Sequence, residues 1–482
     1  MEVRITREDV IYGYLAQFFN YGTGLLILPF ILHELTAAEV GMNYVMLSVG
    51  TLANIADLGF AGQIGRNVTY VLSGARVIYK DEIGTVKTSD NVDYGLLKTI
   101  IDASKFLYGR ISLVVLVLLI SFGTLYMYHV TEGFSNVDNS IIIWILFAIS
   151  TYFNLYFLYY NSLLTGAGLI KEHKMSVILS KVVYFVLCIV LIFAGLGLMG
   201  MVIANLVSPF VARYYCYKKF YSEEMLDNLP SEKTDRQTVI YALKDIWVTA
   251  RKNGTNTIGH FVGTQGSTFI AGIYLPITAT AQWGLMVQLF SAVQGLASSM
   301  CLSLYPEFCK LRLQGEKELY LKKSSLSVAL MIVVVSLGGT AIMLAGPWLI
   351  ELLKSETMLP SSSLMFVYFI YVIILTNAQL FAVMMSSRNV IPSPIAVLIT
   401  TVGQILLTIM LLHYTGVGIW ALLLGPAISG CSYTLWKWSE LELKNLNISA
   451  FRFYSIGFKE LFCYVKSYLR LLYPQRLKSK DR

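Results

Sequence analysis

Long apolar stretches alternate with short polar loops along most of the chain. Each stretch is about 20 residues long, the length at which an α-helix crosses the hydrocarbon core of a membrane. Lipid offers the backbone no hydrogen-bond partners, so each stretch is expected to be helical. The pattern predicts about twelve transmembrane helices, at residues 10–32, 40–60, 108–128, 140–163, 175–196, 198–217, 254–276, 282–304, 325–346, 362–385, 394–414 and 416–437.

Lysine and arginine residues predict the orientation of these helices. Positive residues in short loops are retained on the cytoplasmic side of a membrane. In the loops that follow odd-numbered helices, Lys354 is the only one. The others lie in the termini, in the loops after even-numbered helices, or at the adjoining helix ends. Both termini are therefore expected to be cytoplasmic.

A polar interruption divides the predicted helices into two halves. Residues 38–47 can be aligned with residues 281–290, so that Gly41 matches Gly284 at the start of the second helix of each half. Repeated halves are a known plan of transporters, with the substrate site between them. The expected organisation is an N-terminal six-helix bundle at 1–217, a cytoplasmic linker at 218–247, a C-terminal six-helix bundle at 248–437 and a basic tail at 438–482.

The basic tail contains a predicted amphipathic helix at residues 449–473. Its cationic residues recur at spacings of seven and four, and its opposite stripe is apolar. Such a helix can lie on an anionic cytoplasmic leaflet, or it can pack as a tail helix on the cytoplasmic loops. The cationic residues are Arg452, Lys459, Lys466 and Arg470.

Composition excludes several classes of protein. Of 482 residues, 56% are hydrophobic and 14% are charged, so a soluble fold could not bury the apolar surface. The net charge of +8 is explained by a positive cytoplasmic face beside anionic lipid, and it needs no nucleic acid. The chain has neither metal-ligand cysteine spacing nor a phosphate-binding loop. We therefore expect a transporter without a cofactor, coupled to H⁺ or Na⁺ if it is coupled at all, and not an enzyme.

Polar residues inside a span are costly unless they meet a partner or water, so they indicate candidate sites. The seventh predicted helix is the most polar, and five of its polar residues recur at steps of four and three. This spacing predicts one helical face that lines a substrate cavity. The alternative is that small polar residues hold packed helices together. The five residues are Asn253, Thr257, His260, Thr264 and Ser267.

Two further helices carry polar faces. The first helix has Gln17 and Asn20, which would oppose the seventh helix if a two-fold axis relates the halves. The fourth helix has Tyr152, Asn154 and Tyr156. Aromatic rings suit the apolar faces of sugars and amides bind hydroxyl groups, so these residues are also expected in the cavity. Tyrosines are common at membrane interfaces as well, and that alternative stays open.

Three charged residues lie in or beside the predicted spans. Asp57 is near the cytoplasmic end of the second helix, and Arg66 follows nine residues later. A carboxylate in a membrane can bind a proton or a sodium ion and so couple transport, or it can cap a helix or pair with Arg66. Lys181, in the fifth helix, can attract a diphosphate or an acidic sugar to the cavity, or it can extend to the interface.

Two short motifs resemble a known family. Residues 41–66 begin at a glycine, continue to Asp-Leu-Gly at 57–59 and end at Arg66. Residues 161–171 contain Leu-Leu-Thr-Gly followed by a basic loop. They resemble the second and fourth helices of bacterial polysaccharide exporters of the Wzx type. These exporters belong to the multidrug/oligosaccharidyl-lipid/polysaccharide (MOP) exporter superfamily, and Asp57 and Arg66 match the pattern of the family.

The resemblance implies a fold and a function. The fold is an all-α polytopic membrane protein with two six-helix bundles in a V, as in multidrug and toxin (MATE) exporters. The function is that of a flippase in the bacterial inner membrane. It moves an undecaprenyl-diphosphate-linked oligosaccharide, such as an O-antigen or capsule unit, to the periplasmic leaflet by alternating access. The implied partners are this substrate, membrane lipids, a polysaccharide polymerase and assembly proteins.

Two alternatives to the flippase stay open. A cation-coupled multidrug exporter of the same superfamily would be expected to carry more buried carboxylates than Asp57 alone. A membrane glycan polymerase or glycosyltransferase would need a long external loop or a cytoplasmic catalytic domain, whereas the predicted external loops are short.

Overall fold

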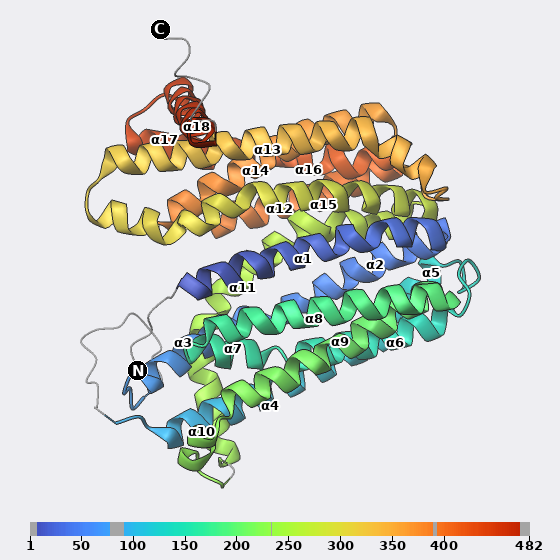
Figure 1. Cartoon of the computed structure of the whole chain (residues 1–482). Helices are drawn as coiled ribbons and strands as arrows, with labels where there is room; N and C mark the ends of the chain where they lie inside the picture. The colour runs from blue at the N-terminus through green and yellow to red at the C-terminus, as the bar shows by residue number, and fades with distance from the viewer. Residues whose placement is uncertain (1–6, 78–90, 233, 389–392, 473–482) are drawn as a thin grey trace. The chain divides into compact units, whose positions relative to one another are not determined.

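A computed structural model describes residues 7–77, 91–232, 234–388 and 393–472 of the chain. Every regular element in these ranges is a helix, and none is a strand (Figure 1). The prediction of an all-α fold is therefore confirmed.

Contacts within the chain divide it into two compact units. Unit 1 comprises Met1–Gly284 with Ile350–Met358. Unit 2 comprises Leu285–Leu349 with Leu359–Arg482. These contacts do not test whether the chain consists of two repeated six-helix bundles, so that organisation stays a prediction.

Unit 1 contains the first eleven α-helices and the start of α12. The expected linker at 218–247 includes α10 and the first turns of α11. The helices are α1 (Arg7–Glu34), α2 (Ala37–Asn54), α3 (Phe60–Leu72), α4 (Tyr94–Leu118), α5 (Thr124–Val130), α6 (Ser140–Tyr156), α7 (Tyr159–Gly166), α8 (Ile170–Leu191), α9 (Gly197–Phe220), α10 (Glu223–Asn228), α11 (Arg236–Tyr274) and α12 (Ile277–Leu313).

Unit 2 contains the rest of α12 and the last six helices. Within it, α15 packs along α16 and α14 packs along α17. The helices are α13 (Lys317–Leu352), α14 (Ser362–Ser386), α15 (Pro394–Tyr414), α16 (Ala421–Ser432), α17 (Thr434–Leu446) and α18 (Ala450–Leu472).

Eight helical segments of the described chain are long and apolar enough to cross a membrane, or nine if α2 and α3, bent by 43°, form one span. The segment Ile170–Phe220 holds both α8 and α9. Gly195 and Gly197, with φ of 80° and 45°, interrupt it, and α8 packs back along α9. A helix also lies at each of the twelve expected positions. The number of spans and the orientation of the termini stay predictions.

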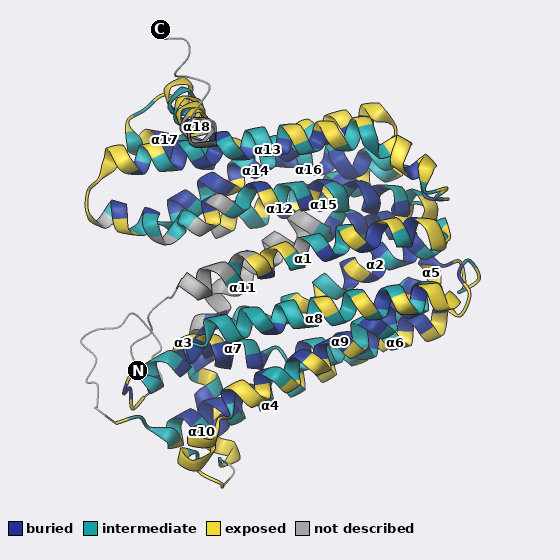
Figure 2. Ribbon diagram, viewed as in Figure 1, coloured by how far each residue is buried: buried dark blue, intermediate teal, exposed yellow. Residues whose placement is uncertain are grey.

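Many large apolar side chains are exposed on the helices of both units (Figure 2). Leu344 of α13 is 77% exposed, and Phe122, between α4 and α5, is 69% exposed. In water each such side chain would cost about 25 cal/mol per Å² of apolar surface, a cost that lipid removes. Together with the apolar segments, these surfaces identify a multi-pass membrane protein.

Glycines allow close approach between helices of unit 1. A Cβ atom on Gly41 of α2 would lie less than 3.0 Å from the carbonyl oxygen of Ile277, at the start of α12. A Cβ atom on Gly284 of α12 would lie less than 3.0 Å from the ring of Tyr44. The two glycines that match each other in the sequence therefore both lie where α2 and α12 cross closely.

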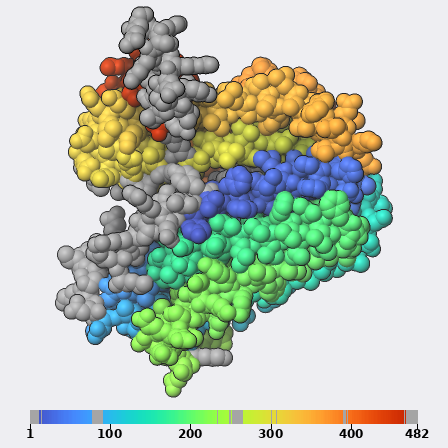
Figure 3. Space-filling view, viewed as in Figure 1, coloured from blue at the N-terminus to red at the C-terminus, as the bar shows by residue number. Residues whose placement is uncertain are grey.

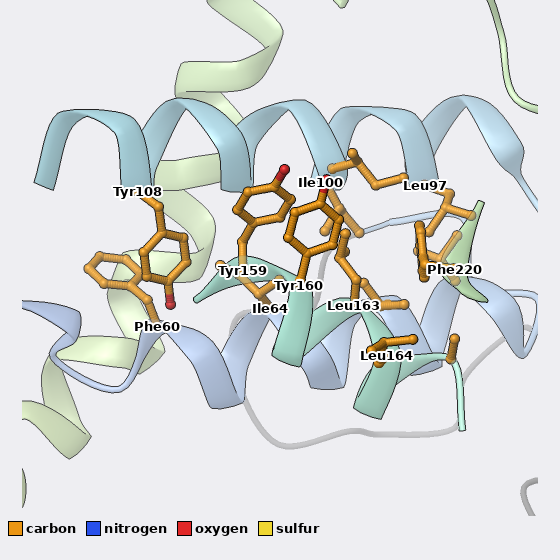
Figure 4. Close-up of a cluster of buried hydrophobic side chains, with 14 of the residues drawn as sticks. Phe60, Ile64, Leu97, Ile100, Tyr108, Tyr159, Tyr160, Leu163, Leu164 and Phe220 are labelled. Carbon is orange, nitrogen blue, oxygen red and sulfur yellow. The ribbon is translucent and has the colours of Figure 1, made fainter. Parts of the chain in front are cut away.

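A buried core cluster in unit 1 joins α3, α4, α7, α9 and α11 (Figure 4). Ile64, Tyr108, Tyr160 and Phe220 are among its members. At its edge the hydroxyl of Thr69 donates to the carbonyl of Gly166 at 2.8 Å. The cluster thus packs these helices together, and it contains Tyr108 and Cys216, which contact polar groups described below.

The last helix, α18, is part of the packing of unit 2. Phe453 is fully buried, and its ring centroid lies 5.4 Å from that of Phe381 in α14. Tyr454 donates a hydrogen bond to Asn377 at 3.1 Å. Phe451, by contrast, is 86% exposed. One side of α18 therefore packs on unit 2, and another remains available to a membrane surface.

We predict that Gly41→Ala destabilises the protein by roughly 1–3 kcal/mol. The new methyl group would clash with the backbone carbonyl of Ile277, which cannot move without displacing α12. Gly62 of α3 provides the matched control, because nothing lies within 4 Å of its Cβ position. Gly62→Ala should leave the stability unchanged or raise it. Thermal unfolding of the purified chain in detergent measures both variants, and equal unfolding temperatures would contradict the close crossing.

Candidate functional site

The second predicted span is interrupted at its Asp-Leu-Gly motif, residues 57–59. α2 ends at Asn54, a single 3₁₀ turn covers Ile55–Asp57, and α3 begins at Phe60. Between them Leu58 and Gly59 have φ of 46° and 79°, in the left-handed region. The Asp-Leu-Gly motif therefore turns the chain between two helices, and a glycine adopts the second of these conformations without strain.

The carboxylate of Asp57 has two hydrogen-bond donors at this break. It accepts from the backbone N–H of Ala61 at 3.1 Å, which caps the first turn of α3. It also accepts from the hydroxyl of Tyr108, which reaches across from α4 (Figure 4). Asp57 is half-buried, so these donors compensate for the water that it loses. Its role in ion coupling stays a prediction.

Arg66 does not pair with Asp57 in the structure. It is exposed on α3 and donates to the side-chain oxygen of Gln63 on the same helix. The two charged residues that the family pattern places together thus have separate partners. Asp57 instead caps the first turn of α3, which was one of the structural roles considered for it from the sequence.

A half-buried arginine, Arg213 of α9, lies near the core cluster. One of its terminal nitrogens donates to the side-chain oxygen of Asn161 at 2.6 Å and approaches the sulfur of Cys216 at 4.0 Å. Its Nε is buried with no hydrogen-bond partner, and it forms no ion pair in the part of the chain that the structure describes. A cation held by neutral groups can attract an anion. Arg213 was not among the site residues predicted from the sequence, although an arginine inside the predicted span 198–217 could have indicated it.

Helices α1 and α8 pack side by side in unit 1 (Figure 3). Lys171 lies 5.3 Å from the ring centroid of Tyr12 near one end of the pair. Near the other end, the rings of Phe30 and Phe193 are 5.7 Å apart. A contact at each end requires that the two helices keep the same direction along their length.

Asn20 and Lys181 therefore lie at similar depth in unit 1. At about 1.5 Å per residue, they are roughly 12 and 15 Å beyond Tyr12 and Lys171. Gln17 and Asn20 are exposed, and Lys181 is half-buried. Among the described residues Lys181 has no ion-pair partner. Asn20 and Lys181 thus supply polar groups at a similar level of two adjacent helices, and Gln17 lies roughly 4.5 Å before Asn20 along α1.

The tyrosines of α6 share a face. The rings of Tyr152 and Tyr156 are nearly parallel, 6.2 Å apart, and both side chains are half-buried. The amide of Asn154 instead donates to the carbonyl of Ser150 in its own helix at 3.0 Å. The aromatic pair can stack on a flat apolar surface, whereas the amide of Asn154 is already used locally.

The polar stripe of the seventh predicted span lies on α11, which is continuous through it. Ser267 is half-buried. The side chains of the other four residues lie outside the described part of the chain, so their place in a cavity stays a prediction. They are Asn253, Thr257, His260 and Thr264.

Two solved structures of transporters resemble the chain over most of its length. The lipid II flippase MurJ, in an inward closed conformation, has a TM-score of 0.63 at 12% identity, covering 96% of this chain and 92% of that one. An inward-facing multidrug resistance MATE family transporter of the MOP superfamily has a TM-score of 0.61 at 14% identity, with 90% and 95% covered. The chain has the MOP transporter fold. A MOP superfamily transporter from Pyrococcus furiosus is also similar, with a TM-score of 0.53 at 13% identity and 93% and 98% covered.

A comparison of the sequence with models of protein families also gives a match. Residues 93–312 match the model of the family described as "Polysaccharide biosynthesis protein". No curated protein sequence matches the chain. The family match and the MOP structures are those of transporters or flippases and not of enzymes. They support the Wzx-type resemblance seen in the sequence, and the predictions of that resemblance and of a MATE-like fold are confirmed.

We predict that Tyr108→Phe lowers the free energy of unfolding by about 1–3 kcal/mol, because it removes a donor from a half-buried carboxylate. Tyr152→Phe is the control, because that hydroxyl has no hydrogen-bond partner in the described chain. Thermal unfolding in detergent compares the two variants. A loss no larger than that of the control would show that the contact between Tyr108 and Asp57 does not stabilise the fold.

The stripe on α11 can be tested by cysteine labelling in a background without the six native cysteines. Cysteines at Asn253, Thr257, His260 and Thr264 should react with a water-soluble thiol reagent, because they share one helical face. Cysteines at Ile258 and Phe261 should not react. Equal labelling of both sets would defeat the assignment of this face to a cavity.

Proposed function

We propose that this MOP transporter is a flippase for an undecaprenyl-diphosphate-linked oligosaccharide, such as an O-antigen or capsule unit. The match of residues 93–312 to a polysaccharide biosynthesis family carries the proposal. The fold supports it, because the lipid II flippase MurJ shares it. The direction proposed is from the cytoplasmic to the periplasmic leaflet of a bacterial inner membrane, by alternating access.

The substrate poses a physical problem that the polar groups of unit 1 can address. Its lipid tail is stable in the bilayer, whereas its sugars and diphosphate would lose their hydration in the hydrocarbon core. Gln17 and Asn20 offer amides to sugar hydroxyl groups, and Lys181 offers a positive charge to the diphosphate. The paired rings of Tyr152 and Tyr156 offer a surface for the apolar face of a sugar ring.

The proposed driving force is an ion gradient. No cofactor is proposed, and Asp57 is the candidate site for coupling to H⁺ or Na⁺. Its carboxylate lies at a helix break beside Tyr108, so a change in its protonation would change the contact between α3 and α4. The proposed partners are membrane lipids, a polysaccharide polymerase and assembly proteins that use the flipped unit.

Cells that lack the gene test the function. We expect a complete lipid-diphosphate-linked oligosaccharide to accumulate and the surface polysaccharide to disappear, as measured by extraction and mass spectrometry. Normal surface polysaccharide with altered drug sensitivity would contradict the proposal and favour a cation-coupled multidrug exporter.

Comparing variants of two lysines of α8 distinguishes a role in substrate binding from a general effect of losing a positive charge. Lys181→Gln should lower the amount of surface polysaccharide at least tenfold in complemented cells, because the substrate diphosphate would lose its counter-charge. Lys174→Gln, closer to the start of the same helix, should retain the wild-type amount. Equal activity of both variants, at equal protein levels, would exclude Lys181 from the substrate path.

A further inference from the structure

Unit 2 contains a pocket of its own, with a volume of about 350 Å³. It lies where the ends of α12, α14 and α17 meet the start of α13. The loops around it are among those that the distribution of lysine and arginine predicts to be cytoplasmic. The polar residues that line it are Arg312, Lys317, Tyr320, Ser387, Arg388 and Asn445.

A buried carboxylate, that of Glu442, holds two of the arginines that line the pocket. Glu442 of α17 is fully buried and forms ion pairs with both Arg312 and Arg388. It also accepts a hydrogen bond from the hydroxyl of Tyr320 at 2.9 Å. A buried ion pair of this kind is costly to break, because the remaining charge would be left without a partner. The arrangement therefore holds two arginines side by side.

Arg312 is held in place on every side. Its Nε donates to the hydroxyl of Ser387 at 2.9 Å, and a terminal nitrogen donates to the side chain of Asn445 at 3.4 Å. Its guanidinium lies 3.9 Å from the ring centroid of Tyr320 and donates to the hydroxyl of that residue at 2.5 Å. Arg312 therefore has little capacity left for a ligand, and its role is to shape the pocket.

Arg388 has hydrogen-bonding capacity to spare. Its one ion pair, to Glu442, is long at 3.5 Å, and its Nε is buried with no hydrogen-bond partner in the described chain. Lys317, the first residue of α13, also lines the pocket and lies at the positive end of the dipole of that helix. No aspartate or glutamate lines the pocket, so three cations face one carboxylate beneath them. This excess of positive charge favours an anion.

We infer that this pocket binds a phosphate-bearing ligand, with Arg388 and Lys317 as its counter-charges. A guanidinium and an ammonium group suit phosphate oxygens, and the volume is that of a small-ligand site. The phosphate can belong to the headgroup of a membrane lipid or to a soluble phosphate compound. The site lies within unit 2, and the inference does not depend on the substrate proposed above.

The test uses the purified full chain and two probes. Inorganic pyrophosphate represents the soluble source and is measured by calorimetry. Phosphatidylglycerol, compared with phosphatidylcholine in mixed micelles, represents the lipid source and is measured by native mass spectrometry. Binding of pyrophosphate would assign a soluble ligand, and selective retention of phosphatidylglycerol would assign a lipid headgroup.

Variants connect either result to the pocket. Arg388→Gln and Lys317→Gln should each weaken the binding of the active probe at least tenfold. Lys322→Gln, an exposed lysine of α13 outside the pocket, should bind as the wild type does. If Arg388→Gln does not fold, Lys317→Gln decides the question, because that residue is exposed at the rim. The inference is overturned if neither probe binds, or if Lys317→Gln binds as tightly as the wild type.

Discussion

Backbone contact at glycines is the constraint on which the packing of unit 1 depends. In lipid, helices gain little from burying apolar side chains against one another, because the hydrocarbon is equally apolar. Association instead needs many close atomic contacts, and these require small residues. Gly41 against Ile277, and Gly284 against Tyr44, bring α2 next to the start of α12. In unit 2, Gly425 of α16 meets the backbone of Thr408 in α15 in the same manner.

Polar groups between the helices are satisfied by neighbours from distant parts of the sequence. Asp57 accepts from Tyr108, and Glu442 is held between Arg312 and Arg388. Such contacts are strong where water is scarce, and an unpaired partner would be costly. They therefore fix how helices are oriented about their axes, which apolar packing alone specifies weakly.

Hydropathy predicted where the helices lie, because each span must satisfy its own backbone in lipid. The two glycines that the alignment matches, Gly41 and Gly284, both lie at the close crossing of α2 and α12. The partners of polar residues could not be found in this way. Tyr108 lies 51 positions from Asp57, and only the packing of α4 on the helix break joins them. The sequence suggested a pair with Arg66 because it lies near in the chain. The local hydrogen bond of Asn154 to the carbonyl of Ser150 in α6 could not be predicted from the sequence either, because an amide in a helix can bond to its own backbone or to a neighbour.

The burial of Phe453 has a consequence for synthesis of the protein. α18 follows α13 and α14 in the chain, so the surface formed by these two helices lacks its cover until α18 has been synthesised. Gly457 fits against the backbone of Ser325 so closely that no larger residue could replace it without displacing the helix. A chain that stops before this helix would therefore display an unfinished apolar surface, and exposed apolar surface of this kind makes an incompletely folded chain prone to aggregation.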